Sequence, residues 1–221
     1  DGPGGSGKGT IASRIAVLRG WRILDSGALY RAFAFSAEKL DVLPDDLVGI
    51  QTVLAETKIE FVVEKTGEVG ILVNGHDVTT TLRSSHAGLV ASTYAAQQAV
   101  RESLITRQRL ERQAPGLVAD GRDMGTVVFP DATLKVFLTG TLEIRALRRY
   151  KQLMEKGFNA TLDAVEQEVS ARDQKDRSRA ISPLVPAKDA VIIDTTKIGI
   201  DQVVQKVDDL LTTKLAPSNK V

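Results

Sequence analysis

The sequence predicts a three-layer α/β fold, in which helices cover both faces of a central parallel sheet. Short apolar runs alternate with helix-like segments, and a glycine-rich turn followed by a helix opens the chain. A third region alternates apolar and polar residues, as antiparallel strands do. We expect about five parallel strands, the first of them preceding Asp1 and missing from this sequence, together with an antiparallel β insert and a helical lid.

The first elements follow the opening loop. Apolar residues at helical spacing predict a helix over residues 11–18, beginning near Gly7. Residues 22–24 form a short segment in which two apolar residues follow Arg22, and a strand is predicted here. Helices are predicted next over 28–40 and 44–56.

The pattern changes at residues 58–80, where apolar and polar residues alternate. A turn is expected at residues 65–67, and Asn74-Gly75 is a strong signal for a two-residue β-hairpin. We therefore predict a small antiparallel insert here.

Helices and strands alternate again after the insert. Helices are expected between residues 84 and 113, and strands over 117–120 and 134–138. The remaining predicted elements are a helix over 141–156, a helix that begins at Thr161, a strand over 191–194, a helix over 200–211 and a frayed tail over 216–221.

The loop over residues 1–10 has the composition of a phosphate-binding loop. Glycines let successive backbone N–H groups turn towards an anion, and the following helix adds its N-terminal amides and dipole. Lys8 would supply a mobile positive charge for the phosphates of a nucleoside triphosphate. The match to G-x-x-x-x-G-K-[ST] departs at Gly9, with Thr10 one place later. The lysine and the spaced glycines favour a P-loop NTPase fold over a plain glycine-rich turn.

Residues 25–31 lie at the carboxyl end of the first predicted strand, where open α/β sheets bind ligands. Ser26 could donate or accept a hydrogen bond at a helix N-terminus, and Arg31 offers a fork for a phosphate. The structural alternative is that Ser26 caps the helix and Arg31 is a solvated surface residue.

Residues 120–126 place two carboxylates and an arginine between glycines, directly after an apolar strand. Asp120 stands where a Walker-B acid would hold the water shell of a metal. Arg122 and Asp123 would project into the same crevice. The alternative is a charged turn whose groups pair with one another.

Arginines crowd two later segments. The helix predicted over 141–156 contains Arg145, Arg148 and Arg149, and residues 172–179 are expected to follow the next helix. Like charges at such density repel one another unless an anion binds or the face is solvated. A phosphate loop in the same chain favours a mobile arginine lid.

Composition narrows the class of protein. The chain has 29 basic and 28 acidic residues, so its net charge does not imply attraction to nucleic acid. It has no cysteine, which excludes disulfides and thiolate metal sites. No apolar run approaches the ~18 residues of a membrane span. We expect a cytoplasmic protein without membrane or nucleic-acid partners.

Four segments together carry a resemblance to a known family. The loop GPGGSGKGT, the run DSGALYR, the stretch ADGRDMGTVVFPDA and the tail RDQKDRSRAISPL resemble the bacterial cytidylate (CMP) kinases, which are P-loop nucleoside monophosphate kinases. The resemblance covers essentially the whole chain. It implies a kinase core over 1–57 and 81–221, a lid at about 145–180, and a CMP-lobe insert over 58–80.

The resemblance implies transfer of the ATP γ-phosphoryl group to CMP or dCMP, with Mg²⁺ as cofactor and a monomeric enzyme. Arg31, Arg122 and Arg179 would grip the CMP phosphate, while Ser92, Arg101 and Asp123 would read the cytosine edge. Without the resemblance, Ser92 and Arg101 would be expected on a helix surface. The residues implied to bind ATP are Gly2, Pro3, Gly4, Gly5, Ser6, Gly7, Lys8, Gly9 and Thr10. Those implied to bind CMP are Ser26, Arg31, Ser92, Arg101, Arg122, Asp123, Arg172, Asp176 and Arg179. The resemblance also implies that Lys8, Arg122, Arg148, Arg149 and Arg179 act in catalysis and that Asp120 holds the metal through water.

Three alternatives stay open at this point. Another nucleoside monophosphate or small-metabolite kinase could use the same loop. A switch GTPase or a nucleotide sensor is a second alternative, and the lack of an Asn-Lys-x-Asp motif counts against the GTPase. Nucleic-acid binding through the arginine segments is a third, and it would be sensitive to salt.

Overall fold

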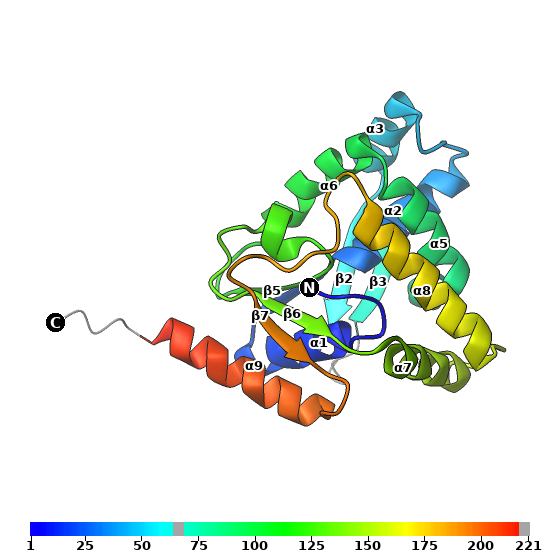
Figure 1. Cartoon of the computed structure of the whole chain (residues 1–221). Helices are drawn as coiled ribbons and strands as arrows, with labels where there is room; N and C mark the ends of the chain where they lie inside the picture. Colours follow the sequence, from blue (N-terminus) through cyan, green and yellow to red (C-terminus); the bar gives the residue numbers. More distant parts are fainter. Residues whose placement is uncertain (64–68, 217–221) are drawn as a thin grey trace. The chain divides into compact units, whose positions relative to one another are not determined.

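The computed structural model describes residues 1–63 and 69–216, and the chain divides into two compact units. The first unit comprises residues 1–15 and 122–221, and the second comprises residues 16–121. The architecture is mixed α/β with parallel strands and covering helices, as the sequence predicts for a P-loop NTPase fold. Figure 1 draws the helices and strands of both units.

The first unit contains a parallel strand pair. Strand β6 (Val136–Thr139) pairs in parallel with β7 (Val191–Asp194), and both consist mainly of β-branched and other apolar residues. Helix α1 (Lys8–Arg19) begins in this unit, directly after the glycine-rich loop. Helix α9 (Ile200–Leu215) follows β7 and runs four residues beyond the predicted end.

Helices α7 (Leu142–Glu155) and α8 (Leu162–Ser178) pack against each other through Leu153, Val165 and Val169 (Figure 1). Thr161 caps α8 as predicted, accepting a hydrogen bond from the backbone N–H three residues on.

The arginine-rich segment expected to follow α8 is instead part of that helix, so the prediction was wrong there. The physical reason lies in contacts with residues that are distant in the sequence. Asp173 and Asp176 on the last turns of α8 are buried and pair with arginines of other segments, which holds the charged sequence in helical form.

A short π-helix, η1 (Met124–Val128), was not predicted. The carboxylate of Asp1 accepts hydrogen bonds from the backbone N–H groups of Met124 (2.9 Å) and Gly125 (2.8 Å). These bonds satisfy donors that the start of a helix leaves unpaired, so the first residue of the loop also fixes the segment after Arg122.

The second unit contains the other parallel pair, β1 (Arg22–Asp25) with β5 (Leu117–Asp120). Helices α2 (Ser26–Lys39), α3 (Leu47–Glu56), α5 (Ser85–Tyr94) and α6 (Gln98–Leu110) complete it. Its core includes Phe33, Ile50 and Leu104, and Phe33 meets Tyr94 edge to face.

The antiparallel insert forms as expected. Strands β2 (Ile59–Val63), β3 (Val69–Val73) and β4 (His76–Asp77) make one sheet in that order, and the short helix α4 (Thr79–Leu82) follows. Asn74 and Gly75 have positive φ values of 50° and 80°, as a type I′ hairpin turn requires. The turn predicted at residues 65–67 and most of the predicted tail lie outside the described residues.

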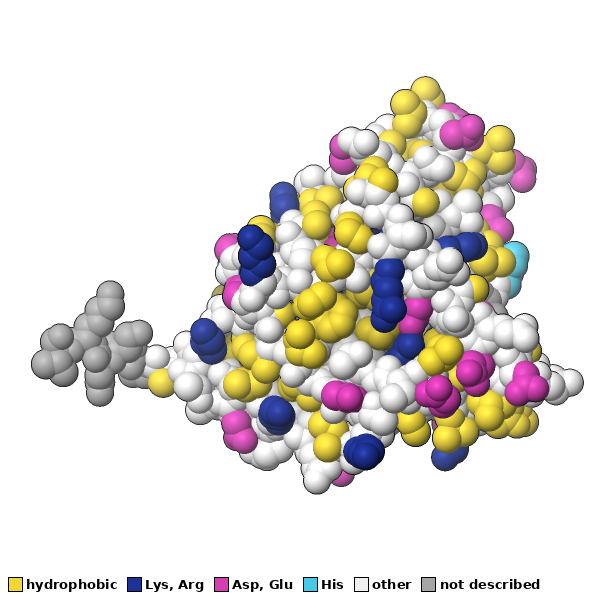
Figure 2. Space-filling view, in the orientation of Figure 1, with side chains coloured by type: hydrophobic (Ala, Val, Ile, Leu, Met, Phe, Trp, Pro, Cys, Tyr) yellow, Lys and Arg dark blue, Asp and Glu magenta, His cyan; other side chains and the backbone are white. Residues whose placement is uncertain are grey.

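Charges of both signs are interspersed on the face drawn in Figure 2, without a single basic field. Within residues 1–63 and 69–216, no helix is both long and apolar enough to cross a membrane.

Candidate active site

The glycine-rich loop turns over residues 4–7 and passes directly into α1. Gly5 has a φ of 74°, and a Cβ at this position would lie 2.5 Å from the backbone oxygen of Arg145, so only glycine fits. Lys8 donates to the carbonyl of Pro3 at 3.2 Å, which curls its side chain over the loop. The hydroxyl of Ser6 is buried, and it has no hydrogen-bond partner among the described residues. The loop therefore has the shape and the spare donor that a phosphate group needs.

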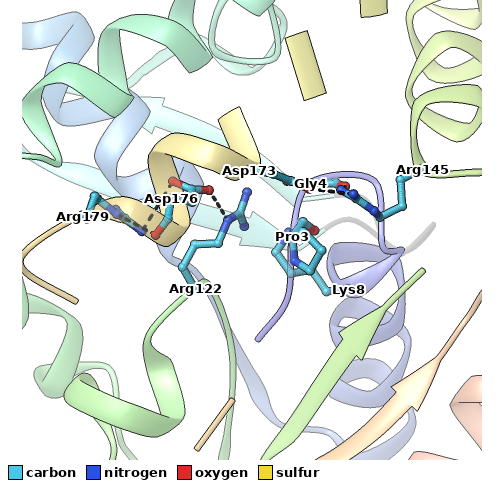
Figure 3. Close-up of polar contacts among 8 residues, drawn as sticks. All are labelled: Pro3, Gly4, Lys8, Arg122, Arg145, Asp173, Asp176 and Arg179. Atoms are coloured by element: carbon cyan, nitrogen blue, oxygen red, sulfur yellow. Dashed lines mark hydrogen bonds and ion pairs between the residues drawn. The ribbon is translucent and has the colours of Figure 1, made fainter. Parts of the chain in front are cut away.

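Three of the predicted acceptor-site residues meet in the first unit. Arg122 donates through Nε to Oδ2 of Asp176 at 2.7 Å, and Nη2 of Arg179 lies 3.4 Å from Oδ1 of the same carboxylate. Figure 3 shows the two guanidinium groups approaching Asp176 from opposite sides. A Cβ built on Gly4 would lie 3.9 Å from Nη2 of Arg122, so this arginine also borders the loop.

Asp176 is buried, and burial alone would raise the pKa of its carboxyl group. The positive charges of Arg122, Arg179 and Arg172, with the hydrogen bond from Arg122, outweigh burial and hold the pKa below its ordinary value. The cluster therefore keeps a carboxylate between two arginines at neutral pH, and its net charge stays positive.

Asp123 follows Arg122 directly and is buried at the start of η1. The alternative interpretation was a turn whose charged groups pair with one another, but the ion pair of Arg122 is with Asp176 on α8. The hydrogen bonds that the backbone N–H groups of η1 donate to the Asp1 carboxylate hold this segment next to the loop.

The predicted lid arginines differ in their surroundings. Arg148 donates from both terminal nitrogens to Thr195, at 2.9 Å to its hydroxyl and 2.6 Å to its carbonyl. The Thr195 hydroxyl lies 2.8 Å from the carbonyl of Thr139 and 3.2 Å from that of Ser6, so Arg148 reaches the loop through this threonine. Arg149 is half-buried on α7, and Arg172 is half-buried on α8.

In the second unit, Asp25 rather than Ser26 caps α2, accepting from the N–H of Ala28 at 2.8 Å. Ser26 is the first helical residue and is buried. The interpretation of Ser26 as a plain helix cap is therefore wrong. Arg31 lies 3.5 Å from the Asp25 carboxylate and is not a fully solvated residue.

Arg101 on α6 is 2% exposed, which excludes the helix-surface position that the sequence alone would favour. Its Nη1 donates to the carbonyl of Ala95 at 3.2 Å, and its guanidinium lies 5.5 Å from the centre of the Tyr30 ring. Ser92 is half-buried on α5.

Asp120 ends β5 and is buried, in register with Asp25 at the end of β1. In the described part of the chain no three or more histidine, aspartate or glutamate side chains gather as a metal site would require. A cation held mainly by phosphates and water, with one protein carboxylate, is compatible with this donor set.

Two residues that sequence reasoning did not assign stand next to the loop. Arg145 on α7 is buried and pairs with Asp173 on α8 at 2.6 Å. Both line a cavity of about 620 Å³ beside α7 and α8. The sequence showed Arg145 only as one charge of a crowded helix, and no local signal marks it as buried.

A glycine-rich loop before a helix N-terminus, with arginines beside it, defines a P-loop phosphotransferase. The sequence model of the cytidylate kinase family matches residues 1–213. The chain is 49% identical over 210 residues to the cytidylate kinase of Pseudomonas entomophila (strain L48), covering 94% of this chain and 91% of that protein. It is 48% identical to the cytidylate kinase of Pseudomonas putida (strain W619) over the same shares. The chain belongs to the cytidylate kinase family.

Proposed function

We propose that this kinase transfers the γ-phosphoryl group of ATP to CMP or dCMP, yielding ADP and CDP or dCDP. The observation that carries the proposal is the arginine pair beside the glycine-rich loop. Arg122 borders Gly4, while Arg122 and Arg179 share the carboxylate of Asp176. A donor phosphate loop and a second anion site in one unit are what transfer between two phosphorylated substrates needs.

The chemistry needs charge stabilisation rather than a general base. The acceptor is a phosphate oxygen whose second pKa is about 6, so it is largely ionised at neutral pH. The barrier arises from bringing two polyanions together, and cationic side chains offset it as charge shifts in the transition state. We assign this role to Lys8, Arg122 and Arg179, with Arg148 and Arg149 contributing from α7. Comparable arginines are worth about 10³–10⁵ in rate.

Asp176 prepares the acceptor site in this proposal. By holding Arg122 and Arg179 before the phosphate arrives, it reduces the side-chain entropy lost when CMP binds. The resemblance assigns Asp176, with Arg172, to the ribose hydroxyls, and a carboxylate oxygen can accept from a hydroxyl while it pairs with an arginine.

Selectivity for cytosine is assigned to Asp123, Arg101 and Ser92. Arg31 is assigned to the CMP phosphate, and Ser26 to CMP binding. Cytosine presents an amino donor beside acceptors, which a carboxylate and a guanidinium can complement. Uracil presents a carbonyl where cytosine has its amino group, so Asp123 would face an acceptor. That mismatch disfavours UMP.

Mg²⁺ is proposed to enter with ATP. Asp120 would hold it through water, and the ion would supply positive charge that offsets the repulsion between the phosphates. We also propose that the enzyme acts as a monomer in the cytoplasm, where ATP is its phosphoryl donor.

A coupled assay that follows ADP release tests the proposal with CMP, dCMP, UMP, AMP and dTMP as acceptors. We expect CMP and dCMP to give the highest kcat/KM.

Asp123→Asn should lower the ratio of kcat/KM for CMP to that for UMP about tenfold or more, because an amide can donate to the uracil carbonyl. Asp163→Asn, an exposed change on α8, is the control. AMP or dTMP clearly outpacing CMP would overturn the assignment, and an unchanged ratio in Asp123→Asn would remove that residue from base selection.

A further inference from the structure

Arg145 is an arginine in an unusual environment. It is 4% exposed, although arginine is almost never fully buried unless it is paired. Each of its three guanidinium nitrogens has a partner: Nε donates to the Gly140 carbonyl at 2.9 Å, Nη1 to the Gly4 carbonyl at 3.0 Å, and Nη2 lies 2.6 Å from Oδ2 of Asp173. The fork therefore joins the end of β6, the glycine-rich loop and α8.

The bond to Gly4 determines how the loop presents its donors. In a trans peptide unit, C=O and N–H point in opposite directions. Because the Gly4 carbonyl is fixed towards the Arg145 guanidinium, the N–H of Gly5 must point away from that guanidinium. A loop that binds phosphate through backbone N–H groups depends on this orientation.

Asp173 holds the guanidinium in place from the other side. It lies three residues before Asp176, so the two carboxylates share one face of α8. Asp173 pairs with the arginine under the donor loop, while Asp176 pairs with Arg122 and Arg179. One turn of α8 thus supports both the loop and the second anion site (Figure 3).

We propose that Arg145, held by Asp173, is a positioning residue that sets the ATP-binding geometry of the glycine-rich loop. This inference rests on the proposed function, because it requires that the loop bind ATP. A buried ion pair is weak grounds for a stabilising role, since apolar residues of similar volume often replace such pairs without loss of stability. The hydrogen bond to Gly4 is the contact that an apolar replacement cannot supply.

The test measures binding of the non-hydrolysable ATP analogue AMP-PNP with Mg²⁺ by calorimetry, using the full chain. Arg145→Lys keeps the charge opposite Asp173 but loses the planar fork that reaches both carbonyls. We expect it to weaken AMP-PNP binding about tenfold, as loss of a charged hydrogen bond predicts, and to leave CMP binding within about twofold. In turnover assays the KM for ATP should rise more than kcat falls. Lys151→Gln, an exposed change on α7, should match the parent.

A double variant, Arg145→Met with Asp173→Leu, separates positioning from stability. It should unfold close to the parental temperature because no buried charge is left unpaired, yet it should bind AMP-PNP as weakly as Arg145→Lys. Recovery of both stability and AMP-PNP affinity in this variant would overturn the inference, as would parental affinity in Arg145→Lys. If Arg145→Lys fails to fold, the double variant decides. If the parent does not bind AMP-PNP at all, the proposed function and this inference are both overturned. If the parent and the variants bind AMP-PNP equally well, only this inference is overturned.

Discussion

Asp176 is a buried carboxylate that two arginines share. Arg122 and Arg179 both contact it, and their charges hold its pKa below the ordinary value in spite of burial. An anion arriving at these arginines would find both guanidinium groups already ordered. A single acidic residue can therefore organise a phosphate site without binding the phosphate.

The lowered pKa of Asp176 predicts an acid-dependent loss of stability. A group whose pKa is depressed by folding contributes stability above its unfolded pKa, near 3.8, and loses it as the pH falls through the folded value. Each unit of depression corresponds to about 1.4 kcal/mol. We expect Asp176→Asn to be less stable than the parent at pH 7 and to show a smaller decline below pH 4, measured by urea unfolding.

The exposed change Asp45→Asn, in a turn outside the helices, serves as the control, and its stability should follow that of the parent at each pH. If the curves for Asp176→Asn and the parent ran parallel below pH 4, the ion pairs of Asp176 would not be the source of this acid sensitivity.

At the scale of elements, the glycine-rich loop is supported by α7. Arg145 holds the Gly4 carbonyl, Arg148 holds Thr195 against the Ser6 carbonyl, and the backbone of Gly5 packs on that of Arg145. The loop is therefore shaped by a helix that lies more than a hundred residues later in the chain.

Gly5→Ala tests this packing. The substitution adds a Cβ that would lie 2.5 Å from the Arg145 backbone oxygen, and it places alanine at a φ of 74°. The left-handed conformation alone costs about 1–2 kcal/mol. We expect AMP-PNP affinity to fall at least tenfold while CMP affinity changes little, as measured by calorimetry.

Gly199→Ala is the matched control for this change. Gly199 has a negative φ of −76°, and a Cβ there would meet only a side-chain atom of Gln202 at 4.0 Å. Undiminished AMP-PNP binding by Gly5→Ala would mean that the loop tolerates a shift away from α7.

At the scale of the whole molecule, both units carry residues assigned to nucleotide binding. The first unit holds the glycine-rich loop with Arg122, Asp123, Asp176 and Arg179, and the second holds Arg31 and Arg101. Each nucleotide should therefore stabilise the folded chain, because a ligand that binds only the native state shifts the unfolding equilibrium.

Thermal unfolding with separate nucleotides tests this expectation. AMP-PNP with Mg²⁺ at about 100 times its Kd should add roughly 2.7 kcal/mol to the free energy of unfolding, and CMP at a matched excess should do the same. Lys8→Met should abolish most of the AMP-PNP effect and preserve the CMP effect, because Lys8 belongs to the donor loop. If Lys8→Met loses both effects while the unfolding midpoint of the free protein is unchanged, the assignment of Lys8 to ATP binding alone is contradicted.

The sequence predicted the local elements well because their signals are local. Glycine spacing, the N-cap at Thr161 and the Asn74-Gly75 hairpin each depend on a few neighbouring residues, and the structure confirms the elements that they mark. The end of α8 and the π-helix η1 could not be predicted in the same way. They depend on pairing with Arg122 and Arg145 and on capping by Asp1, all distant in the sequence.

The sequence by itself determined the α/β class, the glycine-rich loop and, through motif resemblance, the family to which the chain belongs. Only the tertiary structure decided which charges are buried and which partners they have. Arg101 and Arg145 look like surface charges in the sequence, yet both are buried. Burial of an arginine depends on carbonyl and carboxylate partners brought together from distant segments, and helical spacing along one segment carries no information about them.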